Sequence, residues 1–250
     1  MADDLLVCDD LTRMFGALAA VHRLSFRVER QQIFGISGPN GAGKTTLFNL
    51  LSGHVPPTSG TVRFAGRETQ GLPAHRICHL GIARTFQIPL VFGSGTVEEN
   101  VLVGAYFGKR TAPVGLRVEP EVRERVEQAL ELTGLAPVRG REAASVSVYD
   151  KKRLMVASAL ATQPRLLLLD EPVGGLNHAE VDAFVGLIRR LRETGLTVVL
   201  IEHVMRALMS LSDRVMIMHH GEKLAEGTPA EVRADPRVVE VYFGREAATA

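Results

Sequence analysis

One short stretch constrains this chain more than any other: residues 38–45 read Gly-Pro-Asn-Gly-Ala-Gly-Lys-Thr. They match the pattern G-x-x-x-x-G-K-[ST], in which a glycine-rich loop turns its backbone N–H groups toward phosphate oxygens. An apolar, strand-like run at 32–37 precedes the loop, and an apolar, helix-like run at 46–51 follows it. The motif requires this context, because the helix points its positive end at the phosphates. The stretch therefore predicts an α/β fold that binds a nucleotide.

Two side chains of this loop have predicted roles of their own. Lys44 is expected to reach the β- and γ-phosphates, and Thr45 to place its hydroxyl on Mg²⁺. The alternative interpretation is an ordinary glycine-rich turn, which leaves the flanking strand and helix unexplained. The loop residues expected to contact the nucleotide are Gly38, Asn40, Gly41, Ala42, Gly43, Lys44, Thr45 and Thr46.

Composition narrows the class of protein further. The chain has 250 residues, of which 46% are hydrophobic and 23% charged, as in ordinary globular proteins of one or two domains. Its net charge of +1 gives no reason to expect a nucleic-acid partner. Cys8 and Cys78 lie far apart without metal-ligand spacing, and the first residues lack a signal-peptide pattern. The apolar runs are too short to span a bilayer, so any membrane role requires a partner chain.

The residues between 88 and 160 differ in character from those around them. Short strand-like runs come before this stretch, and alternating strand-like and helix-like runs come after it. We therefore predict one domain, with a core formed by 1–87 and 161–250 and a helical subdomain inserted at 88–160. The strands expected before the insertion are 4–10, 20–29, 61–65 and 81–87, the first three antiparallel. The helices expected within it are 96–107, 120–133 and 148–162, with a loop at 108–120.

A phosphate loop needs an acidic partner for Mg²⁺ at the end of a nearby strand. The apolar run Leu166–Leu169 reads as a buried strand, and Asp170 and Glu171 follow it directly. Asp170 is expected to hold Mg²⁺ through water, and Glu171 to polarise the water that attacks the γ-phosphate. The alternative is a solvated acidic turn. After this pair we expect a helix at 177–193, a strand at 197–201, a strand pair at 213–218 and 222–226, and a helix start at 228.

The long gap between Lys44 and Asp170, holding a helical insertion, resembles the nucleotide-binding subunit of an ABC transporter. The resemblance covers nearly the whole chain and implies an ATPase that uses ATP and Mg²⁺. It implies that Gln87 contacts Mg²⁺ and the attacking water, that His203 contacts the γ-phosphate and that Phe15 stacks on adenine. Taken alone, Gln87 reads as a strand-end residue, His203 as a surface histidine and Phe15 as core.

The chain departs from that family at the signature motif, usually Leu-Ser-Gly-Gly-Gln. The aligned residues 146–150 read Val-Ser-Val-Tyr-Asp, followed by Lys151, Lys152 and Arg153. Ser147 is kept and is expected to donate to a phosphate held by the opposite subunit. Both glycines are gone, and the carboxylate of Asp150 repels phosphate, an effect that the following cations partly offset. We therefore hypothesise a weakened signature; the alternative is that this variant works adequately.

Three stretches resemble the larger ATPase of the branched-chain or hydrophobic amino-acid importer group: 11–16, 81–87 with 96–104, and the tail 231–244. The resemblance implies a heterodimer with a second ABC ATPase subunit, two transmembrane permease subunits and, indirectly, a periplasmic solute-binding protein. It places the chain at the cytoplasmic face of the inner membrane, with residues 88–95 as the candidate surface facing the permease. Three alternatives remain: a soluble iron–sulfur assembly ATPase, a lipopolysaccharide-export ATPase and a non-hydrolysing interaction module. The kind of partner separates the first two from the importer.

Overall fold

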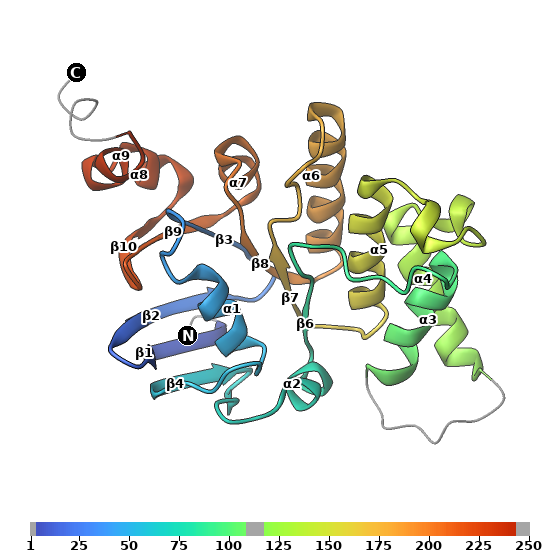
Figure 1. The fold of residues 1–250 in the computed structure, drawn as a ribbon, viewed down its shortest axis with the longest axis horizontal. Coiled ribbons are helices and arrows are strands. Elements are labelled where there is room, and N and C mark those ends of the chain that lie inside the picture. Colours follow the sequence, from blue (N-terminus) through green and yellow to red (C-terminus); the bar gives the residue numbers. More distant parts are fainter. Residues whose placement is uncertain (1–3, 109–117, 244–250) are drawn as a thin grey trace. The chain divides into compact units, whose positions relative to one another are not determined.

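The computed structural model describes residues 4–108 and 118–243, and Figure 1 shows their fold as a ribbon. Two compact units make up the chain, residues 1–74 with 197–250 and residues 75–196. The predicted helical insertion at 88–160 falls within the second unit. Most of the loop expected at 108–120, and the last residue of the 231–244 tail, lie outside the described residues.

The first unit contains the antiparallel sheet that the sequence predicts. Its strands lie in the order β2-β1-β4-β5, and β1 pairs antiparallel with both of its neighbours. β1 continues to Phe15 instead of ending near residue 10, because Asp10 takes a positive φ of 52° and the register shifts there without ending the pairing. The strands are β1 (Asp4–Phe15), β2 (Leu18–Glu29), β4 (Ser59–Phe64) and β5 (Arg67–Glu68).

A second group of strands in this unit carries the phosphate loop. β3 (Ile33–Ser37) lies between β8 (Thr197–Ile201) and β9 (Arg214–His219) and is parallel to both. All five residues of β3 and of β8 are buried, which explains their unbroken apolar runs. β10 (Glu222–Gly227) pairs antiparallel with β9, as the predicted hairpin requires. The helices of the unit are α1 (Lys44–Leu51), α7 (Met205–Leu211), α8 (Pro229–Ala234) and α9 (Pro236–Phe243).

The second unit combines a parallel strand pair with five helices in its described part. β6 (Ile82–Arg84) pairs with β7 (Leu166–Asp170). The strand predicted at 81–87 is shorter than expected: the N–H of Thr85 still donates to Leu168 O at 2.9 Å, and the chain then leaves the ladder. The helices are α2 (Ala74–Leu80), α3 (Val97–Phe107), α4 (Pro120–Thr133), α5 (Val148–Leu160) and α6 (His178–Glu193), with 3₁₀ turns at Ala136–Val138 and Ala143–Ser145.

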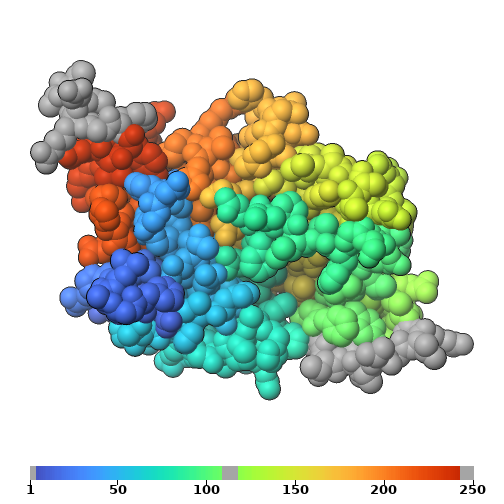
Figure 2. Space-filling view, viewed as in Figure 1, coloured from blue at the N-terminus to red at the C-terminus, as the bar shows by residue number. Residues whose placement is uncertain are grey.

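Helices α3, α4 and α5 share one apolar core, and Figure 2 shows the green-coloured segment around α3 at the surface of the face drawn. The predicted capping box opens α3: Thr96 Oγ1 accepts from Glu99 N at 3.1 Å, and Thr96 N donates to the Glu99 carboxylate at 2.7 Å. The fully buried members of the core include Val97, Val101, Ala105, Leu130, Leu135, Ala143, Leu154 and Ala157. In the described part of the chain, no helix is both long and apolar enough to cross a membrane.

We expect Leu154→Ala to lower the free energy of unfolding by about 2–5 kcal/mol, because it leaves a cavity where α5 meets the other two helices. Leu132→Ala on α4 is the matched control, since that side chain is 38% exposed and its loss costs less than about 1 kcal/mol. Urea unfolding followed by circular dichroism measures both. Equal losses for the two variants would contradict the assignment of this core.

Candidate functional site

The phosphate loop joins the end of β3 to the start of α1, as its sequence context predicts. Two of its glycines are required by close contact between backbones. Gly38 has φ +150°, and a Cβ there would lie 2.1 Å from Met218 O of β9; Gly43 has φ +98°, and a Cβ there would lie 2.1 Å from Ala20 O of β2. No other residue fits at either position. The loop is therefore packed directly against two strands of the first unit.

The amino end of α1 lacks the side-chain caps that other helices of this chain have. Its N-cap is Gly43, no side chain bonds its first N–H groups, and its first turn contains no acidic residue. By contrast, Thr96, Asn177 and Thr228 each form a capping box with a glutamate. The first N–H groups of an α-helix have no partner within the helix, so this end suits an anion.

The ammonium group of Lys44 lies against the loop that it follows. It donates to Gly38 O at 2.7 Å and to Pro39 O at 2.9 Å, and the residue is buried. Asn40, Gly41 and Thr45 are exposed on the loop. A buried cation, uncapped helical N–H groups and an exposed hydroxyl form a donor set that fits a polyphosphate.

The residues around His203 belong to the same unit. Glu202, at the end of β8, is buried, and its Oε2 accepts from His203 N at 2.8 Å and from Val204 N at 2.9 Å. The backbone at His203 is thereby held while its imidazole remains exposed. Ser37 Oγ donates to the Glu202 carbonyl oxygen at 2.8 Å. The turn that carries His203 is therefore connected to the strand that leads into the phosphate loop.

Phe15 is 46% exposed at the end of β1, so it is not a core residue. The guanidinium carbon of Arg13 lies 4.6 Å from the centre of its ring. An exposed ring beside a cation is suited to stacking on a flat base, and the role of Phe15 toward adenine stays a prediction.

The acidic pair lies in the second unit, where the structure shows an ion pair that sequence reasoning missed. The Arg84 guanidinium donates to Asp170 Oδ2 at 2.9 Å, and the two side chains are only 5% and 7% exposed. Burial lowers the pKa of Arg84, and its contact with Asp170 acts in the opposite direction. Arg84 is the last residue of β6, and Asp170 is the last residue of β7, the parallel strand that pairs with it. The position of Arg84 at the end of a predicted strand, three residues before Gln87, was therefore the one sequence signal for this ion pair.

Glu171 makes two contacts that hold it in place. Gln87 Nε2 donates to Glu171 Oε2 at 2.6 Å, so the second unit brings these two predicted catalytic residues together. The buried ammonium group of Lys152 donates to the Glu171 carbonyl oxygen at 2.9 Å. Glu171 itself has a positive φ of 48°, an uncommon backbone conformation for a glutamate. Lys152, like Arg84, contacts the acidic pair in a way that the sequence analysis did not predict.

Ser147 is the N-cap of α5, and its Oγ accepts from Asp150 N at 3.0 Å. Arg153 pairs with Asp150, and its guanidinium carbon lies 4.5 Å from the centre of the Tyr149 ring. The Tyr149 ring also meets the Phe184 ring edge to face, with centroids 6.3 Å apart. Of the two positions that are glycine in the usual signature, Tyr149 therefore carries a packed ring here, and Val148 carries a side chain that is 55% exposed.

Each unit thus assembles one set of predicted site residues. The first unit holds the phosphate loop, Phe15 and His203, and the second holds Gln87, Asp170, Glu171 and Ser147. Among the described residues, no group of three or more His, Cys, Asp or Glu side chains forms a ready-made metal site.

Comparison with known sequences supports the resemblance. Residues 21–174 match the family described as ABC transporter, and residues 222–248 match the branched-chain amino acid ATP-binding cassette transporter family. The chain is 40% identical to the high-affinity branched-chain amino acid transport ATP-binding protein BraF of Pseudomonas aeruginosa, over 98% of this chain and 99% of that protein. It is 38% identical to LivG of Escherichia coli, which has the same description, with the same coverage.

Solved structures agree with the sequence comparison. A nucleotide-free ATP-binding cassette from an ABC transporter superposes with a TM-score of 0.88 at 28% identity, over 97% of this chain and 100% of that one. An ATP-binding cassette of an ABC transporter in its ADP conformation gives the same score and identity, over 97% and 99% of the two chains. The predicted P-loop fold of ABC type is confirmed.

We expect Gly43→Ala to destabilise the folded protein by more than about 3 kcal/mol, because the new Cβ collides with Ala20 O. Gly41→Ala is the matched control: Gly41 also has a positive φ, +80°, but a Cβ there meets nothing within 4 Å. Gly41→Ala should lower the stability only by the strain of placing an alanine in the left-handed backbone conformation, about 1 kcal/mol. Thermal unfolding compares the two, and equal losses would show that the contact with β2 is not tight.

Proposed function

This chain belongs to the ABC transporter family of ATP-binding proteins, and on that premise we propose that it powers the import of branched-chain or other hydrophobic amino acids. The observation that carries the proposal is the match of residues 222–248 to the branched-chain cassette family. Identities of 38–40% to branched-chain transport ATP-binding proteins over nearly the whole chain support it.

We propose that the first unit holds the triphosphate. Lys44 and the uncapped N–H groups at the start of α1 bind the β- and γ-phosphates, and His203 contacts the γ-phosphate. Phe15 stacks on adenine. The donor set around Lys44 supports this assignment, because it combines a buried ammonium group with a helix start that has no side-chain cap.

The second unit is proposed to supply the hydrolytic groups. Thr45 of the loop and Asp170 hold Mg²⁺, which neutralises charge on the phosphate oxygens. Glu171 takes the proton of the attacking water, and Gln87 orients that water and contacts the ion. The hydrogen bond from Gln87 to Glu171 supports this pairing, since it aims the carboxylate before substrate is present.

Two further ATPase features depend on partner chains. We propose that ATP is held between two cassettes, that its binding closes them and that hydrolysis reopens them. The second cassette is a different ATPase subunit, and two transmembrane permease subunits hold the pair at the cytoplasmic face of the inner membrane. A periplasmic solute-binding protein delivers the amino acid to the permeases.

Residues 88–95 are proposed as the surface that faces the permease. Ile88, Leu90 and Phe92 are 73%, 68% and 64% exposed, which is unusual for three large apolar side chains so close in sequence. They follow Gln87 directly, so movement of this segment would reach the residue that orients the water.

Two alternatives have less support. A lipopolysaccharide export ATP-binding protein of Acidithiobacillus ferridurans is 34% identical over 96% of this chain and 97% of its own length. The match of residues 222–248 to the branched-chain family favours the importer over that export role. A soluble iron–sulfur assembly ATPase shares the nucleotide motifs, and the match of residues 222–248 to the branched-chain family favours the importer over it as well.

We expect Glu171→Gln to bind ATP with near-normal affinity and to lose at least about 100-fold in turnover, because the amide cannot accept the proton of the water. Lys44→Ala is the contrasting variant: it should lose ATP binding itself. Calorimetric titration with ATP and Mg²⁺ and a phosphate-release assay measure the two effects. Normal turnover in Glu171→Gln would show that another group is the base.

The same Glu171→Gln variant tests the heterodimer. Its mass in solution, with and without ATP and Mg²⁺, should remain that of a monomer until the second ATPase subunit is added. An ATP-dependent homodimer would contradict the proposed heterodimer and would favour the alternative function in lipopolysaccharide export.

We expect the double variant Val148→Gly, Tyr149→Gly to raise turnover several-fold in the assembled transporter, because phosphate then approaches the backbone closely at Ser147. Tyr149→Phe is the control, since it keeps the ring packed against Phe184 and should change little. A folded double variant with unchanged turnover would show that the native sequence at 146–150 works adequately.

A further inference from the structure

The C-terminal helix reaches back to the root of the phosphate loop. Tyr242, on α9, places its hydroxyl 2.9 Å from the Oγ of Ser37, the last residue of β3. Both residues belong to the first unit. The phenol therefore contacts the residue at which the strand becomes the loop, and Gly38, the first residue of the loop, follows it directly.

The direction of each hydrogen bond follows from counting protons. Ser37 is fully buried and donates its one proton to the Glu202 carbonyl oxygen, so its oxygen accepts from Tyr242. Tyr242 therefore donates in this bond, and its hydroxyl carries the proton. Burial raises the pKa of Tyr242, and the hydrogen bond to Ser37 offsets that only in part, so the phenol keeps its proton at neutral pH.

The result is a directional chain from Tyr242 to the turn that carries His203. It runs from the hydroxyl of Tyr242 through the hydroxyl of Ser37 to the carbonyl oxygen of Glu202, and each bond polarises the next. The Glu202 carboxylate then holds the backbone N–H of His203 at 2.8 Å. Ser37, which leads into the phosphate loop, is thus linked both to Tyr242 and to the turn of His203.

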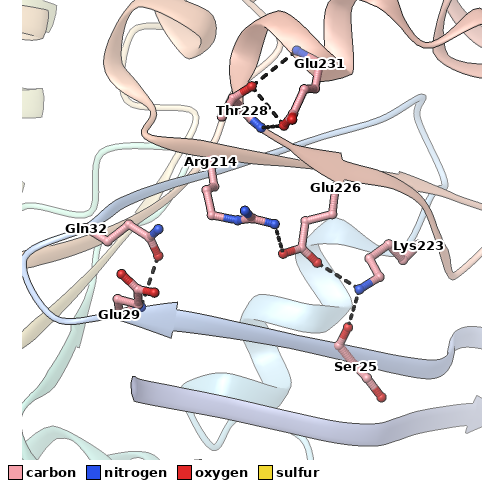
Figure 3. Close-up of polar contacts among 8 residues, drawn as sticks. All are labelled: Ser25, Glu29, Gln32, Arg214, Lys223, Glu226, Thr228 and Glu231. Atoms are coloured by element: carbon pink, nitrogen blue, oxygen red, sulfur yellow. Dashed lines mark hydrogen bonds and ion pairs between the residues drawn. The ribbon is translucent and has the colours of Figure 1, made fainter. Parts of the chain in front are cut away.

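The segment that leads to Tyr242 is itself held at its start. Figure 3 shows Glu226 of β10 accepting from Arg214 at 3.0 Å and from Lys223 at 2.8 Å. Lys223 also donates to Ser25 O of β2 at 2.8 Å, which fixes the hairpin to the antiparallel sheet. Thr228 forms the capping box that starts α8.

The start of α9 is fixed in a similar way, because Asp235 accepts from Arg237 N at 2.9 Å. Each junction between β10 and α9 is therefore closed by a polar contact. The position of Tyr242 follows from this series of contacts and does not depend on its ring alone.

We propose that Tyr242 is a positioning residue for nucleotide binding, through which residues 222–242 fix the Ser37–Gly38 peptide and the His203 turn. The proposal rests on the proposed function as an ATP-binding subunit. It assigns a role to the segment that matches the branched-chain cassette family: this segment holds the phosphate loop in its binding geometry through Ser37.

Tyr242→Phe tests the proposal because it keeps the ring and removes only the hydroxyl. We expect the Kd for ADP and the KM for ATP, both with Mg²⁺, to rise about five- to tenfold, the usual effect of losing one such hydrogen bond. The kcat of the assembled transporter should change less than twofold, since Glu171 and Gln87 are untouched. In the nucleotide-free full-length chain, the Gly38 amide should exchange its hydrogen faster, as measured by NMR.

Two controls separate positioning from general loss of structure. Tyr106→Phe makes the same chemical change on α3 and should leave the Kd and the Gly38 amide unchanged. Ser37→Ala with Tyr242→Phe forms a double-mutant cycle, and the second change should add little to the first if both act through one chain. Melting temperatures of the nucleotide-free variants check that each is folded.

The outcomes distinguish this proposal from the proposed function. Wild-type affinity in a folded Tyr242→Phe, with an unchanged Gly38 amide, would overturn the positioning role and leave the ATPase assignment intact. A wild-type chain that bound no ADP or ATP would overturn the proposed function, and Gly38 exchange in Tyr242→Phe would still decide whether the phenol holds the loop.

Discussion

Contact between backbones at Gly38 and Gly43 is the constraint on which the phosphate loop depends. At each position a single Cβ atom would lie 2.1 Å from a carbonyl oxygen of a neighbouring strand. The loop is therefore seated on β9 and β2 and is not free to relax when no ligand is bound. A binding site whose shape is set before the ligand arrives loses less entropy on binding. The loop joins the buried β3 to the uncapped α1, and Lys44 donates back to its carbonyl oxygens.

Local interactions were the part of the fold that the sequence predicted best. The capping boxes at Thr96, Asn177 and Thr228 each involve two residues that are three positions apart. They can therefore be recognised from the sequence without any knowledge of the tertiary structure. The buried strands at 166–169 and 197–201 are equally legible, because apolar runs of that length need burial on both faces.

Contacts between distant residues were the part that could not be predicted. Arg84 and Asp170 are 86 positions apart, and Ser37 and Tyr242 are 205 apart. No local pattern distinguishes these residues from an ordinary strand-end arginine or a helix-surface tyrosine. The strand predicted at 81–87 ends at Arg84, and Gln87 lies beyond it, where its side chain bonds to the distant Glu171. The roles of the individual site residues remain proposals, although both units assemble the expected sets.

The contact between Tyr242 and Ser37 also bears on the order in which the protein is made. Ser37 leaves the ribosome 205 residues before the phenol that contacts it is synthesised. Strands β8 and β9, which flank β3, also follow it at a long distance in the sequence. The nascent chain must therefore keep an apolar β3 without these neighbours until they have been synthesised, a period in which such strands are prone to aggregate. The residue that leads into the phosphate loop gains its contact with Tyr242 only after both of these strands have been made.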